Sequence, residues 1–148
     1  APDSRKSVDH AQQKDWSKLM GIKREACDKW FSDVIRLKAN HTCECCHNQD
    51  RQMHCCHIYG RGAKSVRWSM DNALCMCSYC HRYYTENPIA FTNFLQIYLG
   101  KGHMEMLNEK WRVILKTNKL LRKDIALHYR EEHKKMVDDA GYEPVSYN

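Results

Sequence analysis

Four cysteines in two Cys-x-x-Cys pairs have the spacing that most directly indicates chemistry in this sequence. The pairs are Cys43 with Cys46 and Cys77 with Cys80, and thirty residues separate them. Thiolates at this spacing typically hold one tetrahedral zinc ion between two separate knuckles, although a lone Cys-x-x-Cys pair can instead be redox-active. We therefore predict a structural zinc ion that brings the two ends of this segment together.

Two histidines and an asparagine accompany these cysteines. Fourteen residues separate His57 from Asn72, eight separate Asn72 from His81, and His81 directly follows Cys80. An imidazole titrates near neutral pH, so His57 is a candidate base that accepts a water proton during hydrolysis of a phosphodiester. We predict that Asn72 hydrogen-bonds the hairpin or the ring, and that His81 holds a divalent metal that acts as a Lewis acid.

Each of these residues also has a simpler interpretation. His57 could be a redundant histidine of the zinc site or a buried, hydrogen-bonded one. His81 could replace Cys80 as a zinc ligand, and Asn72 could be a turn residue. Their joint occurrence at this spacing favours the catalytic interpretation.

Short strand-like runs surround these residues. Residues 54–59 read as the first strand of a hairpin, 60–69 as its loop and 71–76 as its second strand. A short helix over 81–85 then completes a ββα unit. The pattern predicts that the hairpin carries His57 and that the helix carries His81.

Cations gather in and after this unit. Arg61, Lys64 and Arg67 lie in a loop without acidic residues, and Arg82 follows His81. Together with a net charge of +6, they predict contacts to a nucleic-acid backbone, although the loop could simply be a basic surface segment. We predict DNA as the partner and these four residues as its contacts.

Helical periodicity flanks the unit on both sides. Apolar residues recur at helical spacing over roughly 9–39, 89–99 and 104–137, with Asn118 interrupting the last stripe. We predict an α+β fold in which a zinc-stabilised ββα-metal core is flanked by N- and C-terminal helices, with the C-terminal face packing on the N-terminal helix. A single domain of 1–148 would comprise an N-terminal helical arm over 1–41, the core over 42–100, and C-terminal helices and tail over 101–148.

The composition indicates a reducing compartment. The chain has nine cysteines, and no apolar run approaches the length of about eighteen residues that a membrane span needs. We predict an intracellular protein without a membrane segment. The cysteines not assigned to zinc are predicted to be free thiols: Cys27, Cys45, Cys55, Cys56 and Cys75.

The segment from Cys43 to Arg82 resembles the zinc-knuckle HNH endonucleases of the ββα-metal class. Within that class, the runs His57-Ile58-Tyr59-Gly60-Arg61, Arg67-Trp68 and Asp71-Asn72 are most similar to the phage NinG (Rap) recombination nucleases, over about residues 40–100. The resemblance implies a DNA endonuclease that acts on branched recombination intermediates, with a structural Zn²⁺ and a catalytic Mg²⁺ or Mn²⁺. The resemblance is also compatible with a homodimer, since a two-fold dimer suits a symmetric DNA junction. It implies the cytoplasm of a bacterial host as the location.

The sequence departs from the HNH pattern at two positions. Cys56 precedes the candidate base where many HNH enzymes have Asp or His, and Thr85 stands where many have a second histidine. His54, Glu86 and Asn87 are candidates for the rest of the metal's ligands. The alternatives are a nonspecific or site-preferring nickase, a zinc module that binds DNA without cleaving it, and a structural zinc domain that binds protein.

Overall fold

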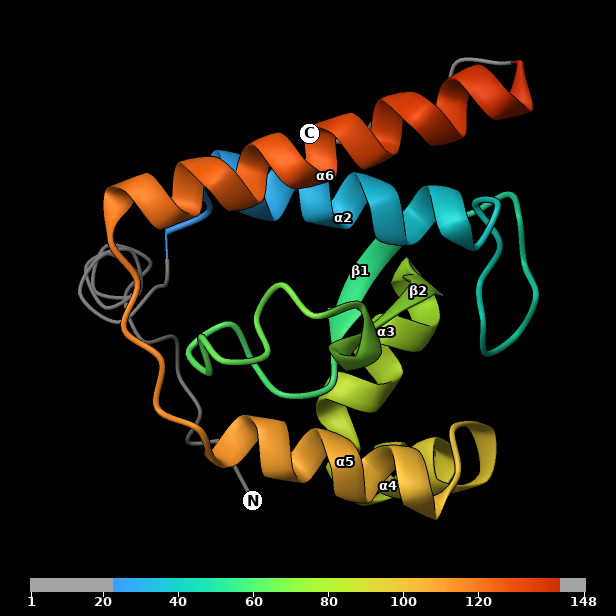
Figure 1. Ribbon diagram of the computed structural model, residues 1–148. Helices are drawn as coiled ribbons and strands as arrows, with labels where there is room; N and C mark the ends of the chain where they lie inside the picture. Colours follow the sequence, from blue (N-terminus) through green and yellow to red (C-terminus); the bar gives the residue numbers. More distant parts are fainter. Residues whose placement is uncertain (1–22, 142–148) are drawn as a thin grey trace, which may run out of the picture.

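The structure, a computed structural model, describes residues 23–141 and is a mixed α+β fold (Figure 1). Its described part contains a two-stranded sheet, five α-helices and one 3-10 helix. In chain order these are α2 (Ala26–Lys38), β1 (Met53–His57), η1 (Met70–Asn72), β2 (Ala73–Cys77), α3 (Ser78–Glu86), α4 (Pro88–Tyr98), α5 (Lys101–Arg112) and α6 (Lys119–Ala140).

The two strands form the predicted hairpin. β1 and β2 are antiparallel, with His54 opposite Met76 and His57 opposite Ala73. All five residues of β2 are buried, and α2 and α3 both contact the sheet. Helix α3 follows β2 without a loop and begins at Ser78, earlier than the predicted start at residue 81. The chain therefore runs strand, strand, helix through the segment that carries the candidate site.

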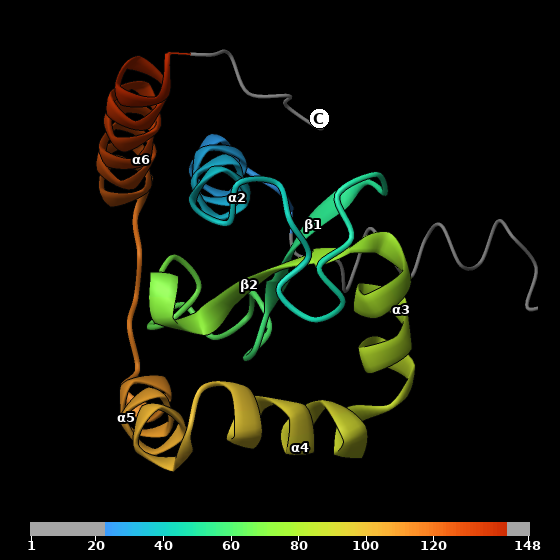
Figure 2. The ribbon, with the colours of Figure 1, turned by 90° about the vertical axis from the view of Figure 1, so that its right-hand side faces the viewer.

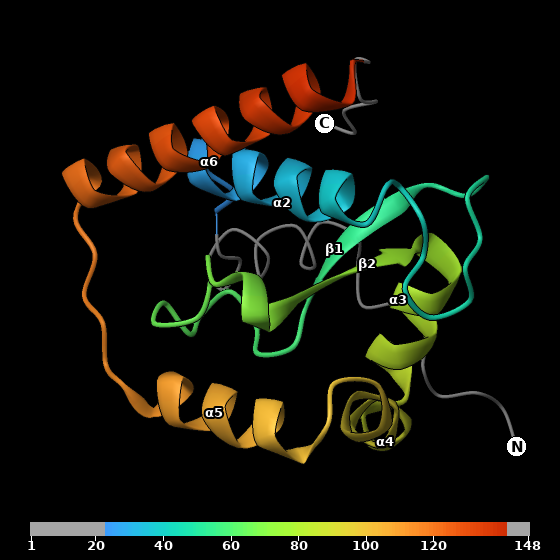
Figure 3. The ribbon, with the colours of Figure 1, turned by 45° about the vertical axis from the view of Figure 1, so that its right-hand side comes forward.

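The helices cover the hairpin from two sides. Figure 1 and the turned view of Figure 2 show α2 and α6 side by side on one side, with α4 and α5 on the other. The segment between α5 and α6 runs along one edge of the molecule and joins the two groups (Figure 3). Within residues 23–141, no helix combines the length and the apolar character that crossing a bilayer requires.

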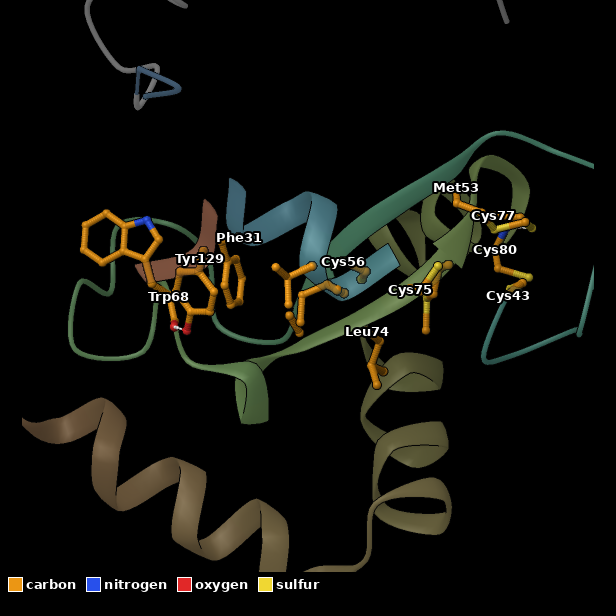
Figure 4. Packing of buried hydrophobic residues seen from close by; sticks show 14 of the residues in the cluster. Phe31, Cys43, Met53, Cys56, Trp68, Leu74, Cys75, Cys77, Cys80 and Tyr129 are labelled. Atoms are coloured by element: carbon orange, nitrogen blue, oxygen red, sulfur yellow. Dashed lines mark hydrogen bonds between the residues drawn. The ribbon is translucent and has the colours of Figure 1, made fainter. Parts of the chain in front are cut away.

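Aromatic residues from distant parts of the chain join α6 to the core (Figure 4). The rings of Phe31 and Tyr129 meet edge to face, with their centroids 5.1 Å apart. The Tyr129 hydroxyl donates a hydrogen bond to the carbonyl of Trp68. Because all three residues are buried, they fix α2, α6 and the hairpin loop relative to one another.

The N-terminal helix is shorter than predicted. Residues 23–25 are not helical and α2 begins at Ala26, so a continuous helix over 9–39 is wrong; residues 9–22 lie outside the described part of the chain. The backbone N–H of Glu25 donates to the carboxylate of Asp28 at 2.8 Å. A side-chain oxygen that accepts this N–H stabilises a helix start, which the apolar periodicity alone does not reveal.

The predicted C-terminal helix is two helices. Residues 113–118 separate α5 from α6, and the side chain of Asn118 accepts the N–H of Leu121 at 2.8 Å, which caps α6. Helix α6 packs on α2 as predicted. Helix α5 lies against α4 and η1 instead.

Candidate active site

Glu44 attaches the first cysteine knuckle to the sheet. Its backbone N–H donates to the carbonyl of Cys75 at 2.8 Å, and its carboxylate accepts the N–H of Cys75 at 2.6 Å. The same carboxylate accepts the hydroxyl of Tyr98 at 2.9 Å. These bonds hold Cys43 and Cys46 beside the end of β2, where the second knuckle begins.

The four predicted zinc ligands form one cluster. The Sγ atoms of Cys43, Cys46, Cys77 and Cys80 all lie within 4.8 Å of one another. Those of Cys46 and Cys77 are 3.8 Å apart, which matches the distance of about 3.8 Å between sulfurs in a tetrahedron with Zn–S bonds of about 2.3 Å. Figure 4 shows three of these cysteines at the end of the hairpin. The four cysteines together are a candidate structural metal site, for which zinc is the best match.

Hydrogen bonds around the cluster favour thiolate at Cys77. Burial opposes ionisation of this thiol, but the N–H of Cys80, at 3.5 Å, and the guanidinium of Arg51, at 3.8 Å, outweigh burial and lower the pKa of Cys77 to about 6. The N–H of Cys46 approaches the sulfur of Cys43 at 3.5 Å in the same way. Because thiolates are the form that binds zinc, these donors fit the proposed metal.

Three of the cysteines outside the cluster are unreactive. All nine cysteines lie in the described part of the chain and none forms a disulfide, as predicted. Burial raises the pKa values of Cys55, Cys56 and Cys75 to about 12, so these thiols stay protonated at neutral pH. They behave as small apolar side chains and offer no nucleophile.

A second cluster of potential ligands does not resemble a metal site. Glu25, Cys27 and Asp28 place one ligand atom each within 4.8 Å of the others. The carboxylate of Asp28, however, already accepts hydrogen bonds from Arg67 and Trp68. The predicted zinc site is therefore the better candidate.

One ring nitrogen of His57 is hydrogen-bonded, and the other has no hydrogen-bond partner among residues 23–141. Its Nε2 lies 3.1 Å from the carbonyl oxygen of Arg67. A carbonyl only accepts, so Nε2 carries the proton and Nδ1 has the lone pair. Burial lowers the pKa of His57 more strongly than the Arg67 carbonyl raises it, so the ring is neutral at pH 7. A neutral imidazole with a free Nδ1 lone pair is the form that a general base requires.

His81 faces a second histidine rather than standing alone. The Nδ1 atoms of His54 and His81 are 2.9 Å apart, with the rings nearly perpendicular. Adjacent ligands of an octahedral metal with bonds of about 2.1 Å are about 3.0 Å apart, so this pair has the spacing of two ligands on one ion. Burial lowers both pKa values, which keeps both rings neutral at neutral pH. Without an ion, the same distance fits an N–H···N hydrogen bond between the two rings.

This pair favours one of the candidate ligands near His81. Glu86 is exposed and pairs with Arg82 at 3.2 Å, and the amide of Asn87 donates to the carbonyl of Tyr83 at 2.9 Å. His54 alone of the three faces His81. The sequence alone did not select His54 as a ligand, because His54 lies three residues before His57 and not directly before it.

One pocket of about 510 Å³ contains all three histidines. Arg24 and Arg61 also line it, and neither has an ion-pair partner among residues 23–141. Arg61 is one of the DNA contacts predicted from the sequence. Arg24 is not among those predicted contacts. The pocket therefore combines a candidate base, a candidate ligand pair and the cations Arg24 and Arg61.

Asn72 supports the hairpin and not the ring. Its side chain is fully buried. Its Oδ1 accepts the N–H of Tyr59 at 2.8 Å, and its Nδ2 donates to the carbonyls of Tyr59 and Val66 at 2.9 and 3.1 Å. Of the two supports considered from the sequence, the structure shows the one on the hairpin loop.

The predicted DNA contacts differ in their positions. Arg61 lines the pocket, while Lys64 is exposed on the other side of the loop and Arg82 is exposed on α3. Arg67 requires a correction: its side chain is buried in an ion pair with Asp28, with 2.6 Å between Nη2 and Oδ2. A guanidinium in this position cannot meet a phosphate, and the loop sequence alone did not reveal its partner 39 residues away.

Comparisons of the chain with protein-family models, with curated proteins and with solved structures found no match. The geometry of the pocket and of the cysteine cluster is thus the basis for a functional proposal.

Proposed function

We propose that this protein is a metal-dependent DNA endonuclease of the HNH type that hydrolyses phosphodiester bonds. The observation that carries the proposal is the position of His57 in one pocket with the His54 and His81 pair. A base beside a candidate metal position is the minimum that phosphodiester hydrolysis needs. The cysteine cluster supports it, because it brings the segment between α2 and β1, which carries Cys43 and Cys46, to the junction of β2 and α3.

His57 acts as the general base in this proposal. Its Nδ1 accepts a proton from the attacking water while Nε2 stays bonded to the Arg67 carbonyl. The water oxygen forms a bond to phosphorus, the bond to the leaving sugar oxygen breaks, and that oxygen takes a proton from solvent. Arg24 and Arg61 offset the charge of the phosphate.

His54 and His81 would hold the divalent metal, which supplies Lewis acidity at the phosphoryl oxygen and leaving oxygen. Two imidazoles suit Ni²⁺, Fe²⁺, Zn²⁺ or a similar borderline ion better than Mg²⁺, which prefers oxygen ligands. We therefore place these borderline ions ahead of Mg²⁺ in this proposal, with Mn²⁺ between them.

Branched DNA is the substrate that the resemblance to the recombination nucleases favours. The structure adds cations that would contact the backbone without reading bases, namely Arg61 at the pocket, Lys64 on the loop and Arg82 on α3. Binding through such contacts weakens steeply with salt and depends little on sequence.

A plasmid-nicking assay tests the proposal. Zinc-loaded protein is incubated with supercoiled DNA and a series of divalent ions, in parallel with His57→Ala and with His128→Ala, which changes an exposed histidine on α6. We expect nicking by the parent and the His128 variant, and loss of about a hundredfold or more in the His57 variant with DNA affinity retained. A parent that binds DNA but cleaves none of it under any ion would instead support a non-catalytic zinc module.

A further inference from the structure

The carboxylate of Asp28 binds the side chains of two consecutive residues in the hairpin loop. It accepts hydrogen bonds from Nε of Arg67 at 2.9 Å, from Nη2 of Arg67 at 2.6 Å and from the indole N–H of Trp68 at 3.0 Å. Asp28 lies in the first turn of α2, and its partners are 39 and 40 residues away in sequence. The ion pair is buried on both sides, with 4% of each side chain exposed.

The same arginine orients the candidate base through its backbone. The side chain of Arg67 is bound by Asp28, while its carbonyl accepts the Nε2 proton of His57 at 3.1 Å. A second bond, from Nη2 of Arg67 to the carbonyl of Lys23 at 3.2 Å, fastens the arginine to the chain just before α2. The position of the Arg67 carbonyl is therefore set by contacts to the start of α2.

The contact between Asp28 and Arg67 depends on the negative charge of Asp28 and on the burial of both side chains. Burial opposes ionisation of Asp28, but the guanidinium of Arg67 and the N–H donors of Glu25 and Trp68 outweigh it and lower the carboxyl pKa. The bidentate contact restrains the arginine more tightly than a single bond would. A neutral side chain at position 28 would leave the buried guanidinium without its counter-ion, and the loop would shift to reach water.

We propose that Asp28 is a positioning residue for the base: through Arg67 it holds the backbone carbonyl that selects the Nε2-protonated form of His57. This inference rests on the proposed role of His57. It extends the catalytic machinery beyond the ββα unit to the first turn of α2, which the motif in the sequence does not include. Asp28 also lines the histidine pocket, but in this scheme it acts through Arg67 and not on the water or the phosphate.

NMR of the histidine side-chain nitrogens in the zinc-loaded protein tests the proposal without relying on activity. The parent should show His57 as a single tautomer with its proton on Nε2, the signals being assigned by their loss in His57→Gln. Asp28→Asn should give a mixture of tautomers. Asp33→Asn is the matched control, because Asp33 also pairs with an arginine from a buried position on α2 but has no contact with Arg67.

Kinetics supply the second readout. We expect Asp28→Asn to lower kcat by about ten- to a hundredfold while KM for DNA stays within about twofold, since misplacement of a catalytic group acts on the chemical step. Should this variant not fold, Arg67→Lys, which keeps the cation but loses the bidentate contact, carries the same two measurements. An unchanged His57 tautomer, or a kcat per folded molecule equal to the parent's, would overturn the proposal. If the parent cleaves no DNA, the tautomer still decides whether Asp28 orients His57, so the two proposals fail separately.

Discussion

Asn72 binds the main chain of Tyr59 through both atoms of its side-chain amide, as acceptor at 2.8 Å and donor at 2.9 Å. Tyr59 lies two residues after the end of β1, and the next residue, Gly60, lines the histidine pocket. The bonds thus close the hairpin loop at the point where it leaves the strand that carries His57. An amide suits this position because it can donate and accept at once.

Replacing Asn72 should destabilise the fold. Asn72→Ala removes three hydrogen bonds made by a fully buried side chain, and it leaves the N–H and the carbonyl of Tyr59 without partners among residues 23–141. We therefore expect the free energy of unfolding to fall by about 2–4 kcal/mol. Asn72→Asp should be at least as damaging at pH 7, because it places a carboxylate against two carbonyl oxygens. Urea unfolding with zinc present measures both. The exposed Asn93→Ala should change stability by less than about 0.5 kcal/mol, and a similarly small effect at Asn72 would contradict this account.

The cysteine cluster should bind one tetrahedral ion per chain. Replacing the metal with Co²⁺ should produce the visible absorption bands of tetrahedral thiolate coordination, with one equivalent saturating the signal. Cys77→Ser should lose both this spectrum and much of the fold, because metal binding and folding are coupled in such sites. Cys45→Ser is the control, since Cys45 lies between the ligands in sequence but outside the cluster. A disulfide between any two of the four cysteines in the purified protein would contradict the site.

The zinc cluster and the ββα order could be predicted from the sequence because both depend on local spacing. Two Cys-x-x-Cys pairs need no knowledge of the rest of the chain, and the strand-like run around His57 indicates a strand directly. Asn72 was predictable as a support for the same reason, since it directly precedes the second strand at the end of the hairpin loop.

Contacts between distant segments could not be predicted in this way. Arg67 looked like a free cation because its partner, Asp28, lies on a helix whose start the periodicity misplaced. His54 was one of several neighbours of the site, and only the register of the hairpin brings it to His81. In both cases the partner is chosen by tertiary packing, which a single sequence does not display.

His54 and His81 should bind the same divalent ion. Each single change to Ala should raise the ion concentration needed for half-maximal cleavage by about tenfold or more, and the double change should add little. The cleavage rate as a function of Ni²⁺ or Mn²⁺ concentration gives these values, and His128→Ala again serves as the control. Fully additive effects would mean that the two rings do not share an ion.

The lowered pKa of His57 makes a prediction about stability in acid. Burial holds the folded pKa below the unfolded value of about 6.5, so the unfolded chain takes up a proton first as the pH falls. Stability from this residue is thus complete above about pH 6.5, decreases as the pH falls through the folded pKa, and is constant below it.

His57→Gln isolates that contribution. Glutamine does not titrate and can still donate to the Arg67 carbonyl, so the parent and the variant share every other pH-dependent process, including zinc release. Urea unfolding at pH 7.5 and pH 5.5 should show a larger loss of stability for the parent than for the variant. Equal losses would mean that His57 titrates like an exposed histidine. In that case, the pocket would not keep its base neutral by burial.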